Sequence, residues 1–142
     1  MGRRANPCET LWEQGPSAFA FLAQEWGFTG PERTDEGIAY HRPGLHVTVQ
    51  LWEWENETGF TTTVRGVDRL TGAEHSASLG CLYVACGLGP LQHVPETAGG
   101  GHTISKRIAQ HAAALRGVLP ALDGPTVVEL LHRCQGRSLP DD

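Results

Sequence analysis

The chain has 142 residues, which is the usual size of one domain, and such a fold buries roughly 68–70% of the surface of its unfolded chain. Its formal charge of −5 excludes the basic surface of a nucleic-acid-binding module, and 39% hydrophobic residues are typical of a globular protein. No run approaches the roughly 18 apolar residues of a membrane span, and no apolar segment follows the two arginines near the start. We therefore expect a cytoplasmic domain without membrane or nucleic-acid partners.

The first predicted element is an amphipathic helix over residues 16–26. Its apolar side chains recur at helical spacing: Phe19, Leu22, Ala23 and Trp26. Pro16 suits the first helical position. Gly27 suits a left-handed residue after the last turn, with Phe28 folding back onto the helix.

Three strands with a period of two follow and predict an antiparallel meander. Taking "HRPG" and "ENET" as the loops places Tyr40 opposite Leu45 and Trp54 opposite Gly59. One face then carries Ile38, Tyr40, Leu45, Val47, Val49, Leu51, Phe60, Thr62 and Val64. The other carries His46, Thr48, Gln50, Trp52, Trp54, Thr61, Thr63, Arg65 and Val67. This pattern predicts one covered face and one wetter face.

The stretch "SASLGCLYVACGLGP" fits either a buried strand or a short helix over residues 76–87. We favour the helix, because Ser76 or Ser78 suits its N-cap and apolar side chains follow at helical spacing: Leu79, Leu82, Tyr83 and Cys86. Residues 91–101 contain breakers and no periodicity, which predicts a mobile loop.

The longest predicted element is a helix over "HTISKRIAQHAAALRGVLPALDG". Its apolar stripe consists of Ile104, Ile108, Ala112, Leu115, Leu119 and Leu122, and Pro120 should kink or end it. A final helix starts at Pro125 and carries Val127, Leu130, Leu131 and Cys134 on one face. The sequence thus predicts one α+β domain over residues 1–142, with frayed ends at 1–10 and 137–142. Its expected order is an N-terminal helix, an antiparallel three-stranded meander, and two or three C-terminal helices.

The segment "GGGHTISKR" at residues 99–107 raises the question of a phosphate-binding loop. A P-loop needs a lysine directly after its last glycine, whereas Lys106 lies five residues beyond Gly101. We therefore expect a connector, with Thr103 capping the helix that follows. A helix N-terminus still attracts anions through its free amide groups.

Other patterns also suggest chemistry. Glu53, Glu55 and Glu57 alternate along the chain and could supply the paired carboxylates of a glycosidase. They lie at a predicted hairpin turn, where carboxylates are solvated, so we expect a charged turn instead.

The four cysteines are Cys8, Cys81, Cys86 and Cys134. Because no second pair of ligands accompanies Cys81 and Cys86, we expect buried thiols and not a zinc site or a disulfide framework.

The histidines show no constellation with a nucleophile and an orienting third group. His41 and His46 flank one hairpin turn, and His111 and His132 fall on helices. We expect these four to be satisfied surface or boundary side chains. No catalytic residue, metal or cofactor is predicted.

The wetter sheet face is the strongest candidate site. Trp52, Trp54 and Arg65 have the composition of a binding hot spot. The polar side chains around them are Thr48, Gln50, Thr61 and Thr63. The alternative is that a C-terminal helix covers this face.

Two resemblances rest on hydrophobic pattern. The run "SLGCLYVACGLGP" followed by "HTISKRIAQHAAALRGVLPAL", within residues 76–131, resembles the C-terminal half of small α+β proteins of unassigned role from high-GC Gram-positive bacteria. The start "FAFLAQEWGF" with the short strands after it is similar to immunity proteins that neutralise contact-delivered toxins. The second resemblance implies a protein-binding role.

We expect a non-catalytic binding protein of the immunity or chaperone-like kind, which recognises a partner protein through the wetter face. The alternative is a small enzyme or small-molecule binder with its site at loop 91–101 and the following helix N-terminus. Its residues would be His93, His102, Thr103 and Lys106. A binder should expose an apolar patch and an enzyme a concave pocket. The oligomeric state stays open.

Overall fold

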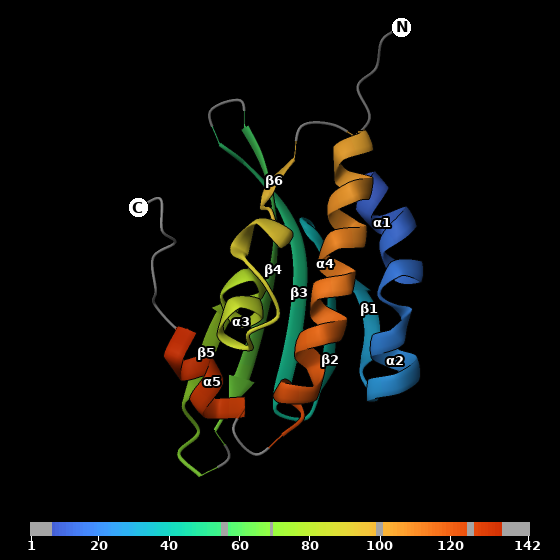
Figure 1. The fold of residues 1–142 in the computed structure, drawn as a ribbon. Helices are drawn as coiled ribbons and strands as arrows, with labels where there is room; N and C mark the ends of the chain where they lie inside the picture. The colour runs from blue at the N-terminus through green and yellow to red at the C-terminus, as the bar shows by residue number, and fades with distance from the viewer. Residues whose placement is uncertain (1–6, 55–56, 69, 99–100, 125–126, 135–142) are drawn as a thin grey trace, which may run out of the picture.

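The computed structural model describes residues 7–54, 57–68, 70–98, 101–124 and 127–134. The chain is α+β, with one antiparallel sheet and its helices on a single side of that sheet (Figure 1). Its elements are α1 (Pro7–Ala18), α2 (Ala20–Trp26), β1 (Thr29–Arg33), β2 (Gly37–Arg42), β3 (Leu45–Trp54), β4 (Glu57–Val67), β5 (Glu74–Ser78), α3 (Leu79–Ala85), η1 (Leu91–His93), β6 (Thr97–Ala98), α4 (Gly101–Leu122) and α5 (Val127–Cys134).

The predicted three-stranded meander is wrong, because the sheet has six strands. Five follow the order β1-β2-β3-β4-β5, and β6 pairs with β4 near the start of that strand. The three missed strands bury few apolar side chains: all of β1 is exposed, β5 buries only Ala77, and β6 has two residues. Hydrophobic alternation records the burial of one face, so strands that bury little leave no such pattern.

The three central strands have the predicted faces, but their register differs by two residues. The turn between β2 and β3 is only Pro43–Gly44, so Tyr40 lies opposite Val47. In the next hairpin Trp54 lies opposite Glu57. Because side chains alternate with a period of two, this shift leaves every face assignment unchanged. Every residue assigned to the covered face is buried.

The N-terminal helix prediction is wrong at its start and right at its end. The chain is helical from Pro7, breaks at Phe19 and resumes as α2, so Pro16 lies inside a helix. Gly15 lets α1 approach the sheet, since a Cβ there would lie 2.7 Å from Ile38 Cδ1. At the far end Gly27 has φ 74°, and the buried Phe28 donates its backbone N–H to the Leu22 carbonyl.

Residues 76–87, for which the sequence allowed either a strand or a short helix, contain the end of a strand followed by a helix. Strand β5 ends at Ser78, which caps α3 by accepting a hydrogen bond from the Cys81 backbone N–H at 3.3 Å. The predicted loop at 91–101 contains η1 and β6, and it buries Val94 and Ala98. Tertiary contacts therefore fix segments that lack any helical or strand period of their own.

The long helix α4 spans the covered face of the sheet, with α1 beside it (Figure 1). Its predicted stripe is buried except for the half-buried Ala112. The helix starts at Gly101, so Thr103 lies within it and is not its cap. It also continues past Pro120, which is exposed, to Leu122. In the described ranges no helix combines the length and the apolar character that a membrane crossing needs.

One polar pair lies inside this core. His111 on α4 and Thr62 on β4 are both fully buried, and their side chains are hydrogen-bonded at 2.8 Å. The second ring nitrogen of His111 donates to the Pro95 carbonyl at 2.8 Å, so Nδ1 accepts from the Thr62 hydroxyl. Burial lowers the pKa of His111 to about 4. This histidine was expected at a boundary, and the fold makes it a core residue.

Candidate functional site

The candidate site is the sheet face opposite the helices. Alternate residues of β3 and β4 on this side are partly or fully exposed, except Gly59, which is buried, and Figure 1 shows no described helix across this face. The expectation of a wetter face is confirmed, and the covering helix is absent from the part of the chain that is described. We call this surface the open face.

The open face brings the predicted partner-binding residues together as cross-strand pairs. Thr48 lies opposite Thr63, and Gln50 lies opposite Thr61. These four side chains are half-buried and form a polar strip between the two ends of the face. Trp54 is the last residue of β3, but its side chain lies outside the described residues.

Trp52 is held on the open face by two contacts. It lies opposite Gly59, where a Cβ would lie 1.8 Å from its Cε2 atom, so the indole occupies the space a side chain would need. Its Nε1–H donates to Thr61 Oγ1 at 3.0 Å. The side chain is nonetheless 41% exposed. With its donor used internally, Trp52 presents mainly apolar ring surface to solvent.

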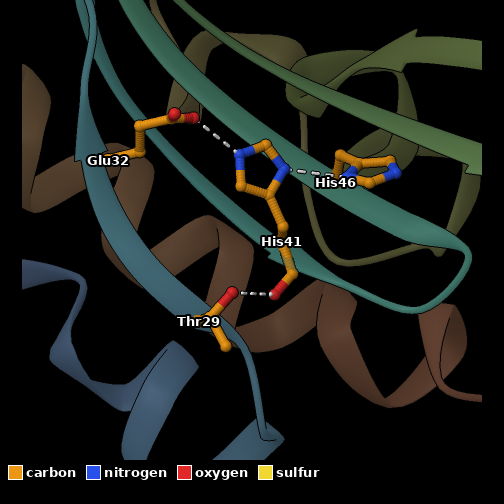
Figure 2. A network of polar contacts seen from close by, with 4 residues as sticks. All are labelled: Thr29, Glu32, His41 and His46. Atoms are coloured by element: carbon orange, nitrogen blue, oxygen red, sulfur yellow. Dashed lines mark hydrogen bonds and ion pairs between the residues drawn. The ribbon is translucent and has the colours of Figure 1, made fainter.

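A row of charged and imidazole groups crosses the other end of the open face, near the β2–β3 turn. His41 Nδ1 lies 2.9 Å from His46 Nδ1, and His41 Nε2 lies 3.0 Å from Glu32 Oε1 (Figure 2). Beyond His46, Arg65 is its cross-strand partner and contacts Glu74 at 3.8 Å. The row therefore spans five strands, β1 to β5, with three basic side chains between one carboxylate at each end.

The contacts constrain the protons of the two imidazoles. An ionised Glu32 only accepts, so His41 Nε2–H donates to it. Between the two rings, one Nδ1 carries the shared proton and the other accepts it. Burial, Arg65 and His41 together lower the pKa of His46, which favours the neutral form of this ring.

Sequence reasoning named His41 and His46 but missed their contact. The four-residue loop predicted at "HRPG" placed His41 inside a turn, whereas a two-residue turn at Pro43–Gly44 places it opposite His46. The Pro-Gly dipeptide was the available signal. Glu32 gave none, because β1 is exposed throughout. Thr29 of the same strand donates its hydroxyl to the His41 carbonyl at 3.1 Å.

The alternative ligand site gains little from the fold. His93 Nδ1 contacts the Tyr83 hydroxyl at 2.8 Å, which directs this ring toward α3. Thr103 is half-buried within α4, and Lys106 is exposed on it. The His102 side chain lies outside the described residues. Of the described side chains in this set, His93, Thr103 and Lys106, none lines either of the two cavities described next.

The structure contains a cavity of about 200 Å³ beside Trp52 and another of about 400 Å³ at the far end of the sheet. The first is bordered by the Cys8 thiol and by carboxylates of Asp35, Glu36 and Glu53. Burial, and then Glu36 and Glu53, raise the pKa of Cys8, so the thiol is protonated at neutral pH and a poor nucleophile. The second contains the ion pair between Arg42 and Asp123, 2.6 Å apart.

Metal-ligating residues do not cluster in large groups. Across the described ranges, no three or more His, Cys, Asp or Glu side chains gather in a geometry that would hold an ion. Among the cysteines, Cys134 is buried, as expected, while Cys8, Cys81 and Cys86 are half-buried.

Comparisons with family models, curated proteins and solved structures find no match for this chain.

Proposed function

We propose that this chain is a non-catalytic cytoplasmic binding protein, of the immunity or chaperone-like kind, that recognises a partner protein through the open face. One observation carries the proposal: the helices of the described residues all cover one side of the sheet and leave the other side, with Trp52, accessible. A six-stranded sheet needs only one covered face to form a core, so the second face is available for another function.

The geometry of the face favours binding over catalysis. Its polar residues lie in the cross-strand rows of a sheet surface, whereas small-molecule sites are concave and enclose most of the ligand. Trp52 is pre-positioned by Gly59 and Thr61, so little side-chain entropy is lost when a partner packs on it. Arg65, half-exposed at the other end, adds a charged anchor.

The test is capture of a partner from the lysate of the native host, read by mass spectrometry. The wild-type protein should retain one stoichiometric partner, and the double variant Trp52→Ala, Arg65→Ala should lose it, because both anchors are removed. A second variant, Gly59→Ala, keeps the indole of Trp52 but displaces it from its position over residue 59, since the new Cβ would overlap the ring. It should weaken capture without removing any aromatic residue.

The matched control removes one exposed apolar and one exposed cationic side chain elsewhere. Leu70→Ala, Arg133→Ala serves this purpose, because Leu70 lies in the β4–β5 turn and Arg133 on α5. This control should capture the partner normally, and all variants should keep the wild-type circular dichroism spectrum. Undiminished capture by the folded Trp52, Arg65 variant would assign the partner to another surface.

A further inference from the structure

We propose that His41 and His46 form a two-imidazole site for a divalent transition metal ion of the kind that nitrogen ligands prefer, such as Ni²⁺, Cu²⁺ or Zn²⁺. The site does not depend on the proposed partner-binding function. It departs from the sequence expectation that both histidines are ordinary surface side chains, and the contact between their rings is the reason.

The donor atoms already face each other. His41 Nδ1 and His46 Nδ1 are 2.9 Å apart, on residues that are direct cross-strand partners. Two nitrogens at 2.0–2.1 Å from a tetrahedral zinc lie about 3.3 Å apart, so to admit an ion the rings must separate by about 0.4 Å and turn both lone pairs toward a common point. The ion would replace the single proton that the two nitrogens share. Residues on paired strands hold the rings in place, which lowers the entropy cost of chelation.

Glu32 supplies the outer contact that metal-binding imidazoles usually have. A ligating histidine typically donates its other ring N–H to a carboxylate, which fixes the tautomer and raises the basicity of the ligating nitrogen. His41 Nε2 makes this contact with Glu32 at 3.0 Å, and the nitrogen that remains is the one that faces His46. Glu32 thus acts as a positioning residue for the site.

The charged groups around His41 and His46 affect how tightly the two rings would bind a metal ion. Glu32 on β1 favours a cation, while Arg65 on β4 opposes one and is partly offset by Glu74 on β5. No larger group of ligands gathers within the described residues, so the site offers two protein nitrogens and leaves the remaining positions to water. Such a site is open, and a bound ion would be exchangeable.

Titration calorimetry with Ni²⁺ alone tests the site, on untagged full-length protein at about pH 7.5, where free imidazoles are neutral. We expect one ion per chain.

His41→Gln and His46→Gln should each weaken binding at least tenfold, because one imidazole does not chelate. Glu32→Gln should weaken it by roughly tenfold, as outer-contact losses do. Arg65→Gln should tighten it by roughly threefold, because a repelling charge is removed. At about pH 5.5 proton competition should weaken wild-type binding at least tenfold.

The control is His132→Gln on α5, whose ring contacts His75 with centroids 5.1 Å apart on the other side of the sheet. It should leave Ni²⁺ binding unchanged. NMR of the wild type provides a readout that needs no variant, since bound Ni²⁺ is paramagnetic and should broaden the ring signals of His41 and His46, whose centroids are 5.1 Å apart, more strongly than those of His132. The proposal is overturned if Ni²⁺ at about 1 mM does not bind at this pH, if the rings of His41 and His46 are not the most strongly broadened, or if His132→Gln removes the binding.

Discussion

At the residue scale, His111 illustrates how a buried polar group is tolerated. Both ring nitrogens are satisfied, one by the Thr62 hydroxyl and one by the Pro95 carbonyl, and this joins α4 to β4 and to the segment before β6. The neutral ring fits this environment, but an imidazolium would have to donate at Nδ1 as well. Protonation would therefore oppose the arrangement, which agrees with the low pKa of about 4.

This burial predicts acid sensitivity. The unfolded chain binds a proton at His111 near pH 6.5, while the folded chain does so only near pH 4. The contribution of His111 to the free energy of unfolding is therefore complete above about pH 6.5 and declines as the pH falls toward 4. Between about pH 7 and pH 4.5 the free energy of unfolding should drop by about 2–3 kcal/mol from this group.

Urea unfolding of the wild type and His111→Gln at both pH values measures the effect. Glutamine supplies one acceptor and one donor but does not titrate, so the variant should show a smaller drop over this range. Equal drops in the two proteins would mean that His111 does not titrate as its burial implies.

At the element scale, Ser78 is where strand β5 becomes helix α3. Its backbone is extended, with ψ 149°, and its hydroxyl accepts from the Cys81 backbone N–H. An N-cap of this kind stabilises a helix by about 1 kcal/mol. The short α3 depends on it, because seven residues cannot hold a helix by propensity alone.

We therefore expect Ser78→Ala to lower the free energy of unfolding by about 1 kcal/mol, which corresponds to a fall of about 4 °C in Tm. Ser78→Asp retains a capping oxygen and should recover most of this loss. The matched control is Ser76→Ala, since Ser76 is exposed two residues earlier in β5. Thermal unfolding followed by circular dichroism separates the two serines, and a similar loss for both would remove the capping explanation.

At the scale of the whole molecule, stability should decrease from the centre of the sheet to its edge. β3 and β4 are paired on both sides and contribute buried side chains along their length, whereas β1 is an edge strand with every residue exposed. Amides of β3 should thus exchange with deuterium at least tenfold more slowly than those of β1, because a strand without buried contacts opens locally. Hydrogen exchange followed by mass spectrometry measures both. Equal rates in the two strands would indicate that β1 opens only with the whole domain.

The site was predictable only in part. The positions of Thr48, Gln50, Trp52, Thr61 and Thr63 on one accessible face follow from alternation along β3 and β4, and that face assignment is confirmed. Their role in binding stays a prediction. The network of Glu32 with His41 and His46 was not predictable from these patterns, since Glu32 lies in a strand without a hydrophobic period and the turn length decides whether the two histidines meet.

The sequence by itself determined which apolar side chains form the covered face of the central strands, and most of the apolar stripe that α4 buries, because those elements bury one face and their apolar residues follow the period of the backbone. Only the tertiary structure decided where β1, β5 and β6 pair, that the helices share one side of the sheet, and that His111 lies in the core. These features depend on contacts between residues far apart in the chain, such as Thr62 with His111. The hydrophobic periodicity of a short segment carries no information about such contacts.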